Sequence, residues 1–167
     1  MKVAILYATK TGTAEKAAKR LAELFAARGD EATVTNLADS RPDLAAVDAV
    51  VLGGSVRIGR WHKRAVAFAR QNETTLINKP LALYACRCGS DDVRQMLGKQ
   101  IGEPLAAHAV FADGVGGEMK LESQKGFDHF VVAQILKSGK NDGMKVTGLL
   151  DERLNALADA LVKATAQ

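Results

Sequence analysis

Threonines and a glycine cluster near the N-terminus, in the run Thr9-Lys10-Thr11-Gly12-Thr13-Ala14. Threonine hydroxyls are neutral hydrogen-bond donors, and a glycine lets the backbone approach a ligand closely. The run follows an apolar segment and precedes a helix-like pattern, so its backbone N–H groups would lie at a helix N-terminus, which favours anions. This spacing predicts a site for a phosphate monoester. The alternative is a threonine-rich helix cap, although capping needs fewer such residues.

A second candidate loop, with a serine and two arginines, follows the apolar run 49–54. It comprises Ser55, Val56, Arg57, Ile58, Gly59, Arg60, Trp61 and His62. If both apolar runs are neighbouring parallel strands, these residues lie beside the threonine loop at the edge of the sheet where strand order reverses. Trp61 is either a cofactor contact or an anchor between helix and sheet.

A third group follows the apolar run that begins at residue 81. It comprises Ala85, Cys86, Arg87, Cys88 and Gly89. Two thiols alone fall short of a zinc site, so we predict no metal centre and treat both cysteines as free thiols.

Other phosphate-binding motifs are excluded because this chain lacks residues that they require. Gly54 and Gly59 have Walker-type spacing, but Arg60 and Trp61 follow in place of Lys and Ser/Thr. The glycines at 114–117 lack the last glycine of a dinucleotide fingerprint. A phospho-acceptor receiver domain needs an aspartate at the end of the third strand, where this chain has glycines and a serine.

Composition restricts the class of protein further. The chain has 167 residues and a formal net charge of +4, which predicts one domain and favours anionic ligands or an acidic membrane surface. Only 5% of residues are aromatic, which argues against nucleic-acid binding. No apolar run approaches the ~18 residues needed to span a bilayer. The two cysteines are too few for a disulfide framework and indicate a reduced cytoplasmic location.

The elements that must position these loops alternate between strands and helices. We predict strands at Lys2–Ala8, Glu31–Leu37, Asp48–Ser55, Leu81–Cys86 and Ala107–Ala112, and helices at Thr13–Arg28, Trp61–Gln71, 90–100 and from a cap at Asp151. The continuous apolar runs indicate strands covered on both faces, because parallel strands need crossover helices. The expected fold is therefore a doubly wound α/β sheet.

The segment from Asp113 to Thr147 does not fit a simple five-stranded fold, because only a short loop is needed there. It contains a predicted helix at 127–136 with an apolar stripe flanked by lysines. The stripe fits a peripheral membrane contact, a homo-oligomer contact or a packed core helix.

The first loop resembles that of the flavodoxin family in Ile5-Leu6-Tyr7, Thr9, Thr11, Gly12 and Ala17. The resemblance implies strand order 2-1-3-4-5 and an FMN cofactor. Its phosphate would lie in the first loop, its isoalloxazine ring along the second, and the pyrimidine end of the ring against the third. Ala14 departs from the threonine usual in the family, and losing one hydrogen bond to a charged group costs roughly 1.5–3 kcal/mol.

The second loop and its sequel, Gly-Gly-Ser-Val-Arg-Ile-Gly-Arg-Trp-His-Lys, are more similar to the menaquinone-dependent protoporphyrinogen IX dehydrogenases, which also carry a long insertion before the last helix. This resemblance implies an FMN-dependent oxidoreductase that takes electrons from a reduced substrate, such as a porphyrinogen, and passes them to a quinone. Arg57 and His62 are the candidate catalytic residues. The alternatives are a basic flavodoxin that carries electrons to redox proteins, and a flavin-free interaction module.

Overall fold

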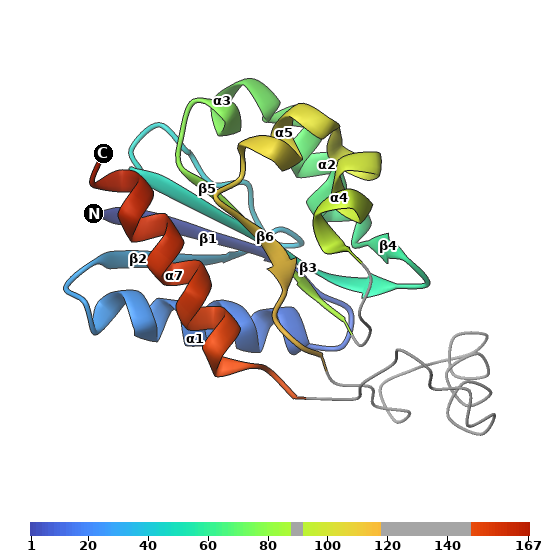
Figure 1. The fold of residues 1–167 in the computed structure, drawn as a ribbon, viewed down its shortest axis with the longest axis horizontal. Helices are drawn as coiled ribbons and strands as arrows, with labels where there is room; N and C mark the ends of the chain where they lie inside the picture. Colours follow the sequence, from blue (N-terminus) through green and yellow to red (C-terminus); the bar gives the residue numbers. More distant parts are fainter. Residues whose placement is uncertain (88–91, 118–147) are drawn as a thin grey trace.

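The computed structural model describes residues 1–87, 92–117 and 148–167. Within them, five parallel strands form one sheet in the order β2-β1-β3-β5-β6, and short β4 pairs antiparallel with β3 (Figure 1). The strands are β1 (Lys2–Ala8), β2 (Glu31–Asn36), β3 (Ala49–Arg57), β4 (Arg60–Trp61), β5 (Leu81–Cys86) and β6 (Phe111–Gly114). The helices are α1 (Thr13–Ala26), α2 (Lys63–Gln71), α3 (Glu73–Ile77), α4 (Val93–Ile101), α5 (Glu103–His108) and α7 (Asp151–Thr165).

This arrangement confirms the predicted fold class. Numbered along the chain without β4, the parallel strands follow the order 2-1-3-4-5. Helices α1 and α7 cover one face of the sheet, where Phe25 and Leu157 share a core cluster. Helices α2, α4 and α5 lie on the other face, where Phe68, Leu97 and Leu105 belong to a second cluster.

The central strands have continuous apolar sequences because helices cover both faces of the sheet. Every residue of β5 is buried, as are the first seven of β3. Strand β2 lies at the sheet edge and is partly exposed, which agrees with its weaker apolar pattern. Neighbouring parallel strands β1, β3 and β5 end at the same edge, so the three predicted loops follow one another along it.

The prediction for the last strand was wrong in its boundaries. Residues 107 and 108 belong to α5, and the strand runs over Phe111–Gly114 instead of Ala107–Ala112. Gly102 ends α4 with φ +99°, and Pro104 sits in the first turn of the next helix, where its missing N–H costs nothing. The apolar residues at 105–106 are therefore the buried face of a short helix.

Two helix starts also differ from the prediction. Helix α2 begins at Lys63 rather than Trp61, because the chain first turns back to form β4. Asp151 is the first residue of α7 and makes no cap hydrogen bond; its carboxylate instead accepts from Arg20 Nε at 3.1 Å. Asp92 does cap α4, accepting from the Gln95 N–H at 3.1 Å.

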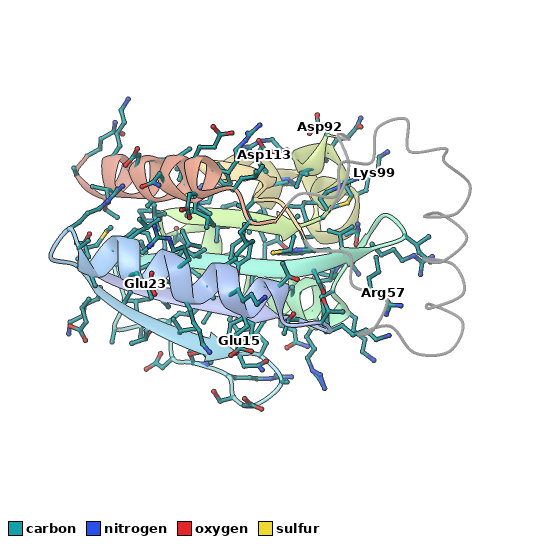
Figure 2. All side chains as sticks on the ribbon, turned by 90° about the horizontal axis from the view of Figure 1, so that it is seen from below. Glu15, Glu23, Arg57, Asp92, Lys99 and Asp113 are labelled. Carbon is teal, nitrogen blue, oxygen red and sulfur yellow. The ribbon has the colours of Figure 1, made fainter. Side chains whose placement is uncertain are left out.

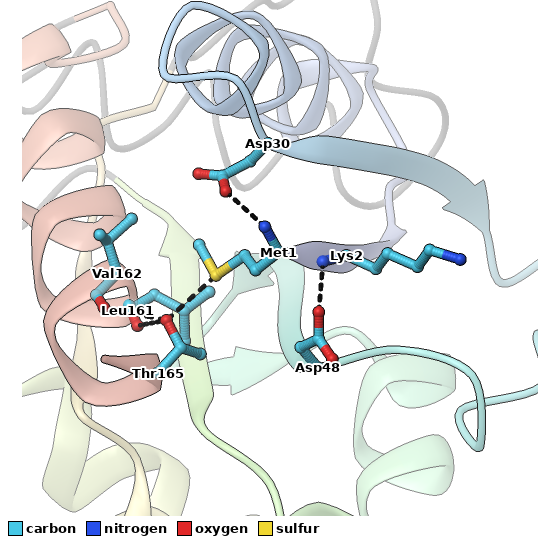
Figure 3. A network of polar contacts seen from close by, with 7 residues as sticks. All are labelled: Met1, Lys2, Asp30, Asp48, Leu161, Val162 and Thr165. Atoms are coloured by element: carbon cyan, nitrogen blue, oxygen red, sulfur yellow. Dashed lines mark hydrogen bonds and ion pairs between the residues drawn. The ribbon is translucent and has the colours of Figure 1, made fainter. Parts of the chain in front are cut away.

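Polar contacts connect neighbouring segments at the end of the sheet opposite the loops (Figure 3). The Met1 amine contacts Asp30 Oδ1 at 2.8 Å, and the Lys2 N–H donates to Asp48 Oδ2 at 2.6 Å. The Thr165 hydroxyl lies 3.1 Å from Met1 Sδ, which ties the end of α7 to the start of β1. The first strand is thus held at the end farthest from the threonine loop.

The predicted insertion falls mostly outside the described residues, including the helix expected at 127–136. At its two ends, Asp113 and Gly114 belong to β6, and Gly116 forms a bridge with Leu149. In the ranges that the structure describes, no helix is long and apolar enough to cross a bilayer.

Candidate functional site

The first loop turns tightly between β1 and α1. Thr9 Oγ1 accepts a hydrogen bond from the Gly12 N–H at 2.9 Å, and Gly12 has φ +93°, a left-handed conformation that favours glycine. Gly12 is the N-cap residue of α1, and no side chain caps this helix. Thr9 therefore supports the start of α1, as the capping interpretation expects of one threonine, and the run contains two more threonines, Thr11 and Thr13.

The first turn of α1 is anchored from below by Tyr84, a fully buried residue of β5. Its hydroxyl donates to the Ala14 carbonyl at 2.8 Å. The ring occupies space left by Gly53 in β3, where an added Cβ would lie only 1.8 Å from Tyr84 Cζ. Tyr84 was not predicted from the sequence; the signal for it was Gly53, because a glycine inside a buried strand often marks a close approach.

Ala14 itself faces the core. Its side chain is fully buried in the same cluster as Ala17 and Ala18. The methyl group at the position where the family resemblance leads us to expect threonine therefore packs beneath the loop.

The second loop is a tight hairpin between β3 and β4. Val56 pairs with Trp61 and Arg57 with Arg60, leaving Ile58 and Gly59 as the two turn residues. Both have positive φ, +49° and +68°, the geometry of a type I′ turn. Figure 2 labels Arg57 at the same end of the molecule as Asp92 and Lys99, far from Glu23.

Trp61 lies in the core rather than on the loop surface. Its side chain is 2% exposed, and its indole N–H donates to the Gly54 carbonyl at 3.2 Å. Its backbone N–H donates to Gln100 Oε1 at 3.0 Å, which ties β4 to α4. The anchoring interpretation of Trp61 fits this position, and its contact with a cofactor stays a prediction.

Ser55 carries a buried hydroxyl at the edge where the three loops meet. The residue is 8% exposed, and its Oγ has no hydrogen-bond partner among the described residues. It pairs in register with Cys86 of β5, one residue beyond the pairing of Gly54 with Ala8 of β1. A buried hydroxyl left without a partner costs free energy, so a polar ligand atom at this edge would stabilise it.

The third loop begins as predicted, with a buried free thiol. Burial raises the pKa of Cys86, so the thiol stays protonated and unreactive at neutral pH. The Ala85 carbonyl accepts from the Val115 N–H at 3.0 Å, and the Arg87 N–H donates to the Gly116 carbonyl at 3.1 Å. Cys88 and Gly89, also predicted at this site, lie outside the described residues.

His62 caps α2, with Nδ1 accepting from the Arg64 N–H at 3.1 Å. In a neutral ring that accepts at Nδ1, the proton is on Nε2, so Nε2 is a donor rather than a base. Burial lowers the pKa of His62, and the charges of Arg64, Lys63, Arg57 and Lys10 lower it further. Cations from the first loop, the second loop and α2 therefore act on one imidazole.

This arrangement predicts a pH dependence of stability. Because the folded-state pKa of His62 lies below the unfolded value near 6.5, the unfolded chain binds the proton more readily, and this site makes stability fall as pH drops below about 6.5. We expect NMR to show the His62 ring titrating below pH 6.5. His62→Asn keeps a cap acceptor, so it should remove this part of the pH dependence without a large stability loss at pH 8. A titration midpoint above 6.5 would contradict the assignment.

The described residues contain no group of three or more His, Cys, Asp or Glu side chains arranged to hold a metal ion. What gathers at the loop edge is instead a donor-rich turn, a partnerless buried hydroxyl and several cations. These groups suit an anionic ligand with polar atoms.

The fold agrees with solved flavodoxin structures. A short-chain flavodoxin associated with a non-canonical PDU bacterial microcompartment superposes with a TM-score of 0.62 at 18% identity, covering 99% of both chains. Flavodoxin 2 from Bacillus cereus gives 0.60 at 17% identity, covering 98% of this chain and 99% of that one. Rubredoxin oxygen:oxidoreductase from Desulfovibrio gigas also gives 0.60 at 17% identity, over 99% of this chain and 37% of that one. The structure is thus that of a flavodoxin-like α/β protein.

Sequence comparison gives the family. The model for the flavodoxin domain matches residues 4–145, and the chain belongs to this family. Protoporphyrinogen IX dehydrogenase [quinone] from Escherichia coli strain K12 is 33% identical over 86 residues, which are 51% of this chain and 48% of that protein. The chain therefore spans about half the length of the curated relatives it matches.

Proposed function

We propose that the chain is an FMN-dependent oxidoreductase that takes electrons from a reduced organic substrate and passes them to a quinone. The observation that carries the proposal is the first loop, a threonine-rich turn with left-handed Gly12 at the N-terminus of α1. The similarity to a quinone-linked dehydrogenase supports the reaction class.

The residues present fit FMN. The first loop and the N-terminus of α1 would hold the phosphate, through the hydroxyls of Thr11 and Thr13 and through backbone N–H groups. The Ser55 hydroxyl has no hydrogen-bond partner among the described residues. A polar atom of the bound cofactor would supply that partner. Bound there, FMN supplies reversible electron transfer, while the chain supplies position and electrostatics.

The remaining predicted contacts follow the order of the loops. The hairpin residues Val56–Gly59 would lie along the ring, and backbone groups of 85–89 would contact its pyrimidine end. Buried Ala85 and Cys86 suit such backbone contacts, because their side chains are not available at the surface. Arg57 would favour a negative charge on the reduced ring.

His62 fits a role as a hydrogen-bond donor through Nε2, because its Nδ1 already accepts the Arg64 N–H. We therefore propose that it orients a carbonyl or carboxylate of the substrate rather than removing a proton. A porphyrinogen, whose propionates suit the basic surface, is the proposed substrate.

A second candidate is an electron carrier between proteins. It is favoured by the short-chain flavodoxin, a protein that this chain matches over nearly the full length of both. A carrier would bind FMN in the same loops, but would not turn over an organic substrate.

The test begins with the visible spectrum of the purified protein and an FMN titration of any flavin-free fraction. We expect a flavin spectrum and saturable binding, followed by quinone-dependent oxidation of protoporphyrinogen. Flavin binding without this turnover would favour the carrier. Failure to bind FMN after titration would contradict both proposals and leave the flavin-free interaction module.

A single-domain organisation, a cytoplasmic location and a homo-oligomer or membrane contact through 113–147 stay predictions.

A further inference from the structure

A groove lies beside the second loop, between β4 and helices α2 and α4. Its volume is about 610 Å³, within the range of roughly 300–1,000 Å³ that is typical of small-molecule sites. Gly59 is one of its lining residues and also belongs to the hairpin that we propose lies along the cofactor ring. A molecule in the groove would therefore lie beside the proposed position of the ring.

The walls of this groove are tied together by Gln100 of α4. Its side-chain Oε1 accepts from the Trp61 N–H of β4 at 3.0 Å, and its Nε2 donates to the Gly59 carbonyl at 3.2 Å. Its backbone carbonyl accepts from Arg70 Nε of α2 at 2.7 Å. One residue thus connects all three walls, so the groove is preorganised for a ligand.

Three cations line the groove: Arg60 from β4, Arg70 from α2 and Lys99 from α4. All three are exposed, and none of them has an ion-pair partner in the ranges that the structure describes. Arg70 uses its Nε–H for the Gln100 carbonyl, which leaves the N–H groups of its two terminal nitrogens for a ligand. The groove therefore offers several charged donors that no carboxylate of the described chain neutralises.

Acidic residues are scarce around the groove. Among its described lining residues Asp92 is the one acid, and its Oδ1 already accepts the Gln95 N–H at the start of α4. The sequence has no aspartate or glutamate from 57 to 72 or from 93 to 102, the two stretches that supply the other lining residues. Like charges gathered in this way repel one another, so an anion in the groove would be stabilised.

The lining also has an apolar part. Val66 of α2 and Met96 of α4 are partly buried against the core and contribute to the groove. A thioether side chain is flexible and adapts to the shape of a ligand. Cations beside apolar surface suit an organic acid with an apolar body better than a small inorganic anion.

We propose that this groove binds the carboxylates of the reduced organic substrate, with Arg60 and Lys99 as specificity-determining residues and Arg70 held in place by Gln100. Guanidinium and ammonium groups form strong, charge-assisted hydrogen bonds to carboxylates. The inference rests on the proposed function, and it assigns substrate recognition to three cations that make no proposed contact with the cofactor.

The first test measures binding rather than turnover. The FMN-saturated chain is titrated with protoporphyrin IX, a dicarboxylic acid, and with its dimethyl ester in the same detergent, and porphyrin fluorescence gives the affinities. We expect the diacid to bind about tenfold more tightly than the ester, and added salt to reduce this difference. An ester that binds as tightly as the diacid would overturn the proposal, as would an absence of binding by the diacid.

The residues are tested with Arg60→Gln and Lys99→Gln together. This double change should weaken binding of the diacid about tenfold and leave binding of the ester unchanged, because only the diacid has carboxylates to lose. The control, Lys2→Gln with Lys163→Gln, removes the same charge from exposed lysines at the other end of the sheet and should weaken binding less than about twofold. Equal losses from both pairs would reduce the effect to net charge and contradict the assignment.

Steady-state kinetics separate this site from the proposed reaction. Because the groove would hold a part of the substrate that does not react, Arg60→Gln with Lys99→Gln should raise KM for protoporphyrinogen about tenfold with kcat unchanged. Groove-dependent binding of the diacid without any turnover would support the site and reject the proposed reaction. Turnover with the KM of the parent chain would reject the site and support the reaction.

Discussion

Gly53→Ala is expected to cost more than about 3 kcal/mol of unfolding free energy, a large part of the stability of a small domain. An alanine Cβ at this position would lie 1.8 Å from Tyr84 Cζ and 2.0 Å from Cε1, so the ring must leave its place. Tyr84 is fully buried, and moving it also breaks the hydrogen bond from its hydroxyl to the Ala14 carbonyl. Denaturant unfolding followed by circular dichroism measures the loss.

The same substitution at Gly148 is the control, because nothing lies within 4 Å of an added Cβ there. We expect Gly148→Ala to change stability by less than about 0.5 kcal/mol. If the clash with the ring is the cause, Gly53→Ala combined with Tyr84→Ala should cost clearly less than the sum of the two single changes. An unfolding midpoint of Gly53→Ala equal to that of the parent would contradict the packing described for this pair.

Gly12→Ala is expected to weaken FMN binding by about 10- to 100-fold. Gly12 has φ +93°, where an L-residue costs roughly 1–2 kcal/mol, and the proposed phosphate donors are backbone N–H groups that follow this turn. Relaxing the turn would move those donors. Because an added Cβ meets nothing within 4 Å, the effect is one of backbone conformation and not of collision. Fluorescence titration with FMN gives the affinity.

Gly29→Ala provides a matched control on the same helix. Gly29 follows the C-terminal end of α1 with φ +84°, and an added Cβ there also meets nothing within 4 Å. Both variants should therefore lose a similar amount of stability, whereas only Gly12→Ala should lose FMN affinity. Equal affinities for the two variants would argue against a phosphate site in the first loop.

Several features of the site were predictable because they depend on local pattern and on the geometry of parallel strands. Continuous apolar runs identified β1, β3 and β5, and parallel strands bring their following loops to one edge. Asp92 was predicted at the start of α4 from its residue type, and it caps that helix. A free, buried Cys86 was also expected, since two cysteines make neither a framework nor a zinc site.

Other features depend on contacts between residues far apart in the sequence. The apolar residues at 105–108 fit a strand or a short helix equally well. In the structure they form a helix that packs against the sheet. Trp61 was open to two interpretations because an indole has both an apolar body and a donor. Its burial depends on Gly54 and Gln100, which lie 7 and 39 residues away in the sequence.

By itself, the sequence of this protein determined the order of the five parallel strands and the longer helices, the doubly wound class and the placing of three loops at one sheet edge, since these follow from short-range periodicity and strand geometry. Only the tertiary structure decided which side chains support that edge. Tyr84 reaches Ala14 across 70 residues because Gly53 on the intervening strand leaves room for its ring. The strained, exposed Ile58 appears only once β4 turns back on β3, because the register of that hairpin sets the sign of φ.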